Sequence, residues 1–120
     1  MLIFVYGSLK RGYPNHHILE EQKFLGNART EKGYTIYEYG CPVLVIEGDD
    51  YVEGELYLCD DEAVYYLDRL EHHPTLYTRL PINVVGHNDV EAYVWTHKLS
   101  QIAVHCGRNW ENPLWKNLCQ

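Results

Sequence analysis

The chain has 120 residues, of which 46% are hydrophobic, and this is enough to build the core of a single domain over residues 1–120. Its formal net charge of −7 argues against a nucleic-acid-binding protein, which would carry a basic patch. No stretch reaches the roughly 18 apolar residues of a membrane-spanning helix. The apolar run Leu2–Val5 is too short for a signal-peptide core and has no basic leader, so we expect a cytoplasmic protein with no membrane partner.

Short apolar and alternating segments predict about seven strands and two main helices. In chain order, we expect strands at 2–5, 24–29, 34–39, 42–46, 52–58, 77–85 and 90–96, and helices at 14–22 and 62–70. This order is typical of an α+β fold, here with a small, mixed, mostly antiparallel and β-barrel-like sheet that is closed or nearly closed. Residues 97–120, which include Trp110 and Trp115, show no pattern that predicts their packing.

The first strand stops abruptly at Tyr6-Gly7-Ser8-Leu9. Glycine permits the sharp exit that such an end requires. A sharp exit leaves consecutive backbone N–H groups without a strand partner, and such groups bind anions or developing oxyanions. The loop is therefore a candidate binding site.

The segment 52–58 alternates, with Val52, Gly54, Leu56 and Leu58 on one face and Glu53, Glu55 and Tyr57 on the other. Gly54 in the middle of the strand indicates a bulge or a close approach of another backbone. Two glutamates with this spacing suggest the paired carboxylates of a glycoside hydrolase, but solvent-facing side chains are the preferred interpretation.

The helix predicted at 62–70 leads to the candidate catalytic residue. Asp60 or Asp61 can cap its N-terminus. Val64 and Leu67 mark its apolar face, and Glu71 continues the same spacing at i+7 and i+4. The carboxylate of Glu71 is thus directed toward the core, where burial raises a carboxyl pKa and suits a general base.

Metal binding is not expected. The paired histidines His16-His17 and His72-His73 have no ligand partner at i+4 in clear register. No C-x-x-C pair is present, so free thiols are expected at all four cysteines, Cys41, Cys59, Cys106 and Cys119.

Three ordered motifs resemble the gamma-glutamylcyclotransferase-like (AIG2-like) family, and within it the gamma-glutamylamine cyclotransferases. The first is Val5–Gly12 followed by Pro14-Asn15-His16, the second is Val52–Tyr57, and the third is Leu67–Glu71 with Pro74, Leu76-Tyr77 and Arg79 after it. The resemblance runs from about residue 2 to residue 96. The double histidine after Glu71 is a departure that leaves the choice of substrate open.

The resemblance implies a lyase-type enzyme of the gamma-glutamylcyclotransferase-like fold that converts a γ-glutamyl amide to 5-oxoproline and a free amine. The α-amine attacks the γ-carbonyl of the same molecule, with Glu71 as general acid and base. Tyr6, Gly7, Ser8 and Leu9 would bind the γ-glutamyl part, and Tyr77 would form part of the pocket wall or core. The partner is a small γ-glutamyl molecule, and no cofactor or metal is implied.

Three points stay open on sequence grounds. The alternative function is a binding module of the same fold that holds a small γ-glutamyl or amino-acid ligand without turnover. The oligomeric state is not predicted, although Cys119 or the tail that carries Trp110 and Trp115 could contribute to a dimer. Arg79 can pair with a neighbouring strand or reach a substrate carboxylate, and the strand pairing is the preferred interpretation.

Overall fold

The computed structural model describes residues 1–112, so Trp115 and Cys119 lie outside the described part of the chain. Its elements, in chain order, are β1 (Leu2–Val5), the 3-10 helix η1 (Pro14–Leu19), β2 (Lys23–Arg29), β3 (Thr35–Glu38), β4 (Pro42–Val45), β5 (Glu53–Leu58), α1 (Asp61–Leu70), β6 (Tyr77–Val84), β7 (His87–Trp95) and β8 (Val104–His105). The predicted α+β class is confirmed, and the strands and helices fall close to the expected segments. No helix among residues 1–112 is long and apolar enough to cross a membrane.

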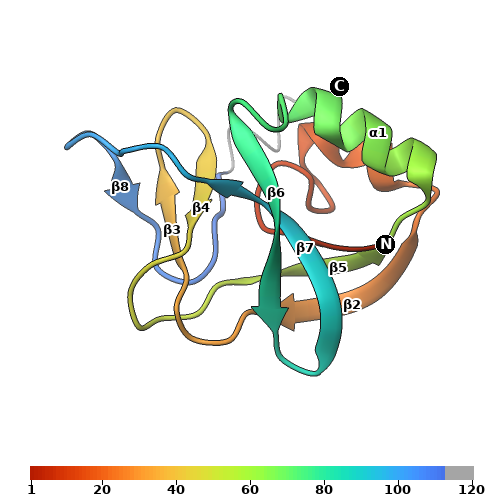
Figure 1. Ribbon diagram of the computed structural model, residues 1–120, viewed down its shortest axis with the longest axis horizontal. Helices are drawn as coiled ribbons and strands as arrows, with labels where there is room; N and C mark the ends of the chain where they lie inside the picture. The colour runs from red at the N-terminus through yellow and green to blue at the C-terminus, as the bar shows by residue number, and fades with distance from the viewer. Residues whose placement is uncertain (113–120) are drawn as a thin grey trace.

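The strands form two mixed or antiparallel sheets rather than one closed barrel. A five-stranded sheet has the order β2-β5-β1-β7-β6, and a three-stranded sheet has the order β4-β3-β8 (Figure 1). Only the β1–β7 pairing is parallel; the other pairings are antiparallel. The large sheet is open, although its edge strands meet at one end through an isolated bridge between Thr30 and Val84.

The core lies on both faces of β1, because its side chains alternate between two clusters. Phe4 packs in the cluster that contains Ile36 and Leu44 of the small sheet. Ile3 and Val5 pack in the second cluster, which contains Ala63, Val64 and Leu67 of α1. Figure 1 shows α1 and η1 together on this side of the molecule. Burial on both faces explains why β1 reads as a continuous apolar run.

The prediction for the solvent-facing side of β5 is wrong at Glu55, because β5 is also buried on both faces. Glu53 and Glu55 were expected to face solvent. Glu53 is exposed, but Glu55 is only 8% exposed, and Tyr57 on the same face is 1% exposed. Leu58 was assigned to the apolar face, and it is 43% exposed. The second cluster contains Tyr57 together with α1 and η1 residues, so a second layer covers the face that alternation alone assigns to water.

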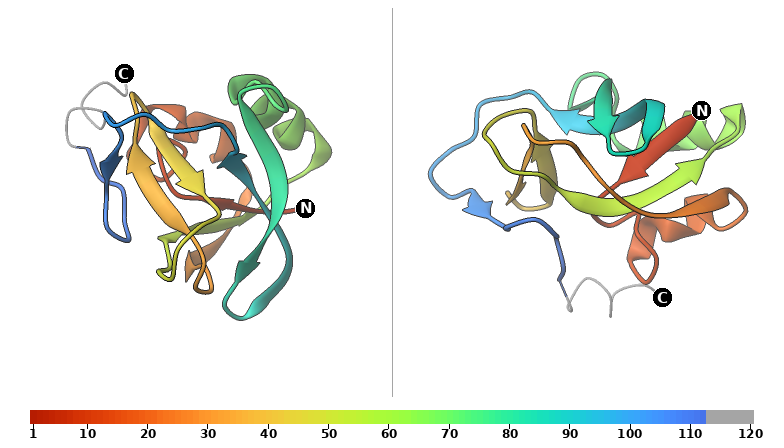
Figure 2. Two further views of the ribbon diagram at one scale, coloured as in Figure 1. Left: turned by 60° about the vertical axis from the view of Figure 1, so that its left-hand side comes forward. Right: turned by 90° about the horizontal axis from the view of Figure 1, so that it is seen from below.

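Three other segments differ from the expectation. The predicted helix at 14–22 is a short 3-10 helix, and its last turns are closed by Glu20 N–H to His17 O and Gln22 N–H to Leu19 O. The β6–β7 turn is tighter than predicted, because Val84 already pairs with His87. The segment after β7 contributes β8, which lies beside β3 (Figure 2).

Candidate active site

The loop that follows β1 lines a cavity through Gly7, Ser8 and Leu9. No described residue accepts a hydrogen bond from the backbone N–H of Gly7, Ser8 or Leu9. Gly7 is required here because a Cβ atom at this position would lie 2.4 Å from Cγ of Pro42, at the start of β4. The backbone at Gly7 therefore lies so close to Pro42 of β4 that a side chain would not fit between them.

The carbonyl groups of the same loop are all occupied. Gly7 O accepts from Lys10 N–H at 3.0 Å, and Ser8 O accepts from Asn15 N–H at 3.1 Å. Leu9 O lies 3.0 Å from Nδ1 of His16, which must carry the proton because a carbonyl can only accept. Asn15 also donates from Nδ2 to Ser8 Oγ at 2.9 Å. These bonds fix the loop. They leave the backbone N–H groups of Gly7, Ser8 and Leu9 as the loop donors that have no acceptor among the described residues.

Asn15 and His16 belong to the first of the three motifs, but they were not predicted as site residues. Their contribution depends on the 3-10 helix η1, which turns the chain back so that each side chain reaches a loop residue seven positions earlier. A tight helical turn opened by Pro14 is the signal in the sequence that points to this arrangement.

Glu71 lies at the C-terminal end of α1, where its N–H donates to Leu67 O at 3.0 Å. Its own carbonyl accepts from Tyr77 N–H at 3.2 Å, so α1 and β6 both fix its backbone. The carboxylate receives no hydrogen bond from any described residue. Burial raises the pKa of this carboxyl to about 7. A carboxyl with this pKa can accept and return a proton near neutral pH.

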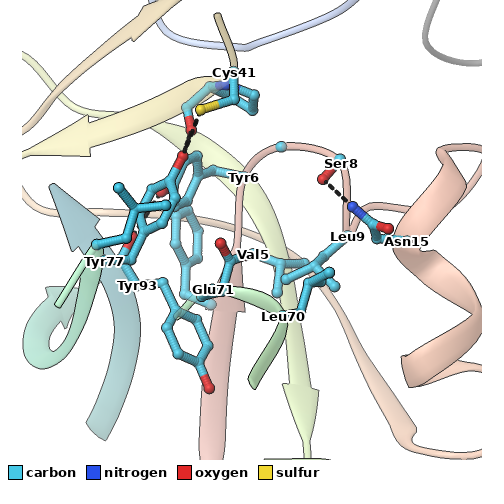
Figure 3. A pocket seen from close by; sticks show the side chains of 14 residues that line it. Val5, Tyr6, Ser8, Leu9, Asn15, Cys41, Leu70, Glu71, Tyr77 and Tyr93 are labelled. Carbon is cyan, nitrogen blue, oxygen red and sulfur yellow. Dashed lines mark hydrogen bonds between the residues drawn. The ribbon is translucent and has the colours of Figure 1, made fainter. Parts of the chain in front are cut away.

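The predicted site residues meet in one cavity of about 210 Å³ between β1, β4, α1 and β6 (Figure 3). All six predicted residues line it, together with residues that were not predicted, namely Phe4, Val5, Asn15, Cys41, Pro42, Leu70, Leu76 and Tyr93. Among these described lining residues, Glu71 is the only one with a carboxylate, ammonium, guanidinium or imidazole group.

Tyr6 and Tyr77 form the wall of the cavity, and their hydroxyl groups are held by the protein. Tyr6 OH donates to Tyr93 O at 2.7 Å, and Tyr77 OH donates to Pro42 O at 2.7 Å. Burial is the main cause that raises the pKa of both phenols above the usual value. Both side chains therefore stay neutral and serve as rigid walls.

Cys41 also lines the cavity, with its Sγ atom 3.1 Å from Tyr77 OH. Burial raises the pKa of this thiol above its usual value, so it is protonated at neutral pH. Cys41, Cys59 and Cys106 are all free thiols, as predicted. Among residues 1–112, no three His, Cys, Asp or Glu side chains gather to hold a metal ion.

A polar network behind Glu71 joins α1 to β6 and β7. Arg79 Nη1 donates to both carboxylate oxygens of Asp68, and its Nε donates to Glu91 Oε1 at 2.9 Å. Tyr93 OH donates to Asp68 Oδ1 at 2.7 Å. Arg79 therefore pairs with carboxylates of the protein, including Glu91 on the neighbouring strand β7. The strand pairing was the interpretation preferred from the sequence. His73 closes the turn after Glu71, because its Nδ1 accepts from Arg79 N–H at 3.0 Å.

We expect Arg79→Met to lower the free energy of unfolding at pH 7 by about 2 kcal/mol, because Asp68 would keep a half-buried charge without its partner. Burial raises the pKa of Asp68, but the bonds from Arg79 and Tyr93 outweigh it and the pKa is lowered overall. The stability that Asp68 contributes is therefore present above its unfolded pKa and is lost as the pH falls through its folded pKa. Urea unfolding at pH 7 and at pH 3 measures both effects.

Arg108→Met is the matched control for Arg79→Met. Arg108 pairs with Asp50 at 2.7 Å, but the side chains are 52% and 37% exposed, against 20% and 27% for Arg79 and Asp68. Solvent screens an exposed pair, so Arg108→Met is expected to lower the free energy of unfolding less than Arg79→Met does. Equal losses in the two variants would contradict the structural role assigned to the Asp68–Arg79 pair.

The fold and the cavity define an α+β protein in which a loop rich in N–H donors faces one buried carboxylate. A family model described as gamma-glutamyl cyclotransferase, AIG2-like, matches residues 3–112. The chain belongs to this family. The match extends beyond Thr96 into the segment that carries Trp110.

Individual relatives agree with this assignment. The chain is 36% identical to a putative gamma-glutamylcyclotransferase of Vibrio cholerae over 102 residues, which is 84% of this chain and 89% of that protein. It is 36% identical to human gamma-glutamylaminecyclotransferase over 96 residues, 69% of this chain and 61% of the human protein. An AIG2-like protein from Mus musculus has a similar solved structure, with a TM-score of 0.78 and 26% identity over 94% of this chain and 90% of that chain.

Proposed function

We propose that the chain is a gamma-glutamylamine cyclotransferase-like enzyme, which converts a γ-glutamyl amide to 5-oxoproline and a free amine. The observation that carries the proposal is the position of Glu71, the only charged side chain among the described residues of a cavity that is also lined by Gly7, Ser8 and Leu9, whose N–H groups have no acceptor among the described residues. Small γ-glutamyl amides, including compounds of the γ-glutamyl-ε-lysine type, are the proposed substrates. The name of the human relative supports this choice.

Glu71 would move the proton twice. The α-amine of the substrate must be neutral to attack, so the carboxylate first takes a proton from the α-ammonium group. The amine nitrogen then bonds to the γ-carbonyl carbon and closes the five-membered ring. When the bond to the leaving nitrogen breaks, Glu71 returns the proton to that nitrogen. The ring nitrogen still carries two protons and gives one of them to the released amine, which departs as an ammonium ion. A carboxyl with a pKa of about 7 suits both steps.

The loop would bind the negative parts of the substrate. No lysine or arginine side chain is among the described residues that line the cavity. The backbone N–H groups of Gly7, Ser8 and Leu9 are therefore the proposed donors to the α-carboxylate or to the oxyanion of the tetrahedral intermediate. Ser8 Oγ accepts from Asn15, which leaves its own hydroxyl proton available to the substrate. Tyr6 and Tyr77 would enclose the aliphatic part.

The pH dependence of kcat/KM follows from the raised pKa of Glu71. Only the carboxylate form can take the first proton, so kcat/KM is expected to rise with pH through about 7 and then reach a plateau. Initial rates between pH 5 and pH 9 on one γ-glutamyl amide measure the profile. A limb centred near 4.5, the ordinary value for a glutamate, would show that a buried Glu71 is not the titrating base.

The direct test is the release of 5-oxoproline from a panel of γ-glutamyl amides with alkyl, aryl and lysyl leaving amines. Release from at least one member supports the proposal and identifies the leaving group. If no member is turned over, but calorimetry detects binding of a γ-glutamyl ligand that is recovered unchanged, the protein is a binding module and the enzyme proposal is wrong.

A further inference from the structure

The loop donors are followed directly by the basic pair Lys10-Arg11, which does not line the cavity. The Lys10 side chain is buried, and the residue is only 8% exposed. Its ammonium group donates to Trp110 O at 2.6 Å and to Asn109 Oδ1 at 2.9 Å. A lysine that is normally solvated thus reaches a segment about 100 residues later in the chain.

The segment that receives Lys10 is anchored in the core. Trp110 is 2% exposed and belongs to the cluster around Phe4 and Ile36. Its ring stacks against Tyr13 with 4.9 Å between the centroids. Arg108 O accepts from Glu53 N–H at 2.6 Å, which ties the same segment to β5. The right-hand view in Figure 2 shows this segment running back toward the side of the molecule that carries η1.

Arg11 anchors the loop on the other side. Its backbone N–H donates to Glu55 Oε1 at 3.0 Å, and its Nε lies 3.4 Å from Glu55 Oε2. Tyr57 OH donates to the same carboxylate at 3.0 Å. This contact gives the buried Glu55 of β5 a structural partner, and it holds the chain one residue after Lys10.

We propose that Lys10 is a positioning residue for the loop Gly7-Ser8-Leu9, called the substrate loop below, which it holds against the segment Asn109–Asn112. The inference deepens the proposed function and depends on it. Lys10 N–H closes the turn with Gly7 O, so a shift of Lys10 is transmitted directly to the N–H groups of Gly7, Ser8 and Leu9. The side chain binds the C-terminal segment, and the backbone of the same residue fixes the donors. Lys10 itself does not touch the substrate.

Lys10→Met tests the proposal, since methionine keeps the apolar stem and removes the ammonium. KM for a γ-glutamyl amide is expected to rise about tenfold, with kcat lowered less than about threefold, because ground-state and transition-state binding weaken together. The acidic limb of the pH profile stays where it is in the wild type. Lys32→Met, an exposed lysine with the same change of charge, is the control.

Asn109→Ala is the second variant, in case Lys10→Met does not fold. Asn109 is exposed, and its replacement removes one of the acceptors that Lys10 has among the described residues, so KM is expected to rise about threefold. The proposal is overturned if a folded Lys10→Met has the same kcat/KM as Lys32→Met. It is also overturned if Asn109→Ala leaves KM unchanged when Lys10→Met is unfolded.

Hydrogen exchange separates this inference from the proposed function. In the absence of substrate, amide exchange of residues 10 and 11, whose N–H groups donate to Gly7 O and Glu55 Oε1, is expected to be at least about fivefold faster in Lys10→Met than in Lys32→Met. Wild-type protein that releases no 5-oxoproline would refute the proposed function alone. Unchanged exchange in the loop would refute the positioning role, whatever the wild-type activity is.

Discussion

Glu71→Gln is expected to lower kcat for 5-oxoproline release by about 10³-fold, because the amide cannot take a proton from the α-ammonium group or return one to the leaving amine. Glutamine has the shape of the carboxyl group, and the backbone bonds of residue 71 to Leu67 and Tyr77 do not depend on the side chain. The substrate KM is therefore expected to change little. Initial rates on the best amide of the panel, for wild type and variant, measure the loss.

Glu21→Gln is the control for Glu71→Gln, because it makes the same chemical change at an exposed position. It is expected to keep full activity. Equal rates in wild type and Glu71→Gln would leave the family assignment intact but would show that Glu71 is not the base.

The same variant is expected to be more stable than the wild type at pH 8, by on the order of 3 kcal/mol. Burial raises the pKa of Glu71 from 4.5 to about 7. Between these values the folded protein keeps a proton that the unfolded chain releases, so stability falls as the pH rises through this window. Glutamine does not ionise, and the penalty disappears. Urea unfolding at pH 4 should show no such difference, and a difference of the same size at both pH values would contradict the burial argument.

Gly54→Ala is expected to lower the free energy of unfolding by about 3 kcal/mol, because its Cβ atom has no space. That atom would lie 2.3 Å from Val5 O and 2.7 Å from Cζ of Phe4, both on β1. A carbonyl oxygen in a paired strand cannot move aside as a flexible side chain can, so β1 and β5 must separate. Because the substrate loop begins where β1 ends, loss of 5-oxoproline release should accompany the loss of stability.

Gly40→Ala is the matched control for Gly54→Ala. A Cβ atom at Gly40 meets no atom within 4 Å, and the only cost is its positive φ of 74°. That cost is about 1 kcal/mol. Urea unfolding of both variants measures the difference. If Gly54→Ala is no more destabilising than Gly40→Ala, the close approach of β1 and β5 does not constrain the fold.

The features that the sequence predicts best are those encoded by neighbouring residues. The β1 strand is short, β-branched and aromatic, and the spacing of Val64, Leu67 and Glu71 directs the carboxylate into the cavity that the structure shows. Gly54 was expected to mark a bulge or a close backbone approach, and the contact with Val5 confirms the approach. The catalytic role of Glu71 stays a prediction, because geometry and burial alone do not measure turnover.

The features that the sequence misses depend on contacts between distant segments. Cys41 and Pro42 reach the cavity because the small sheet folds over the end of β1, and no local pattern encodes that placement. The burial of Glu55 was missed because period-two alternation identifies two faces but does not tell whether a second layer covers one of them. Trp110 lies in a segment without periodicity, so its place in the core could not be read from its neighbours.

The contact between Lys10 and Trp110 has a consequence for the order of folding. Residue 10 leaves the ribosome early, and its side chain finds its acceptors only after residue 110 has followed. Closing so long a segment is slow compared with forming the local turn between Gly7 and Lys10. The strands of the large sheet can therefore pair before Lys10 reaches Trp110, so the loop geometry that we propose for substrate binding would be among the last features that the growing chain acquires.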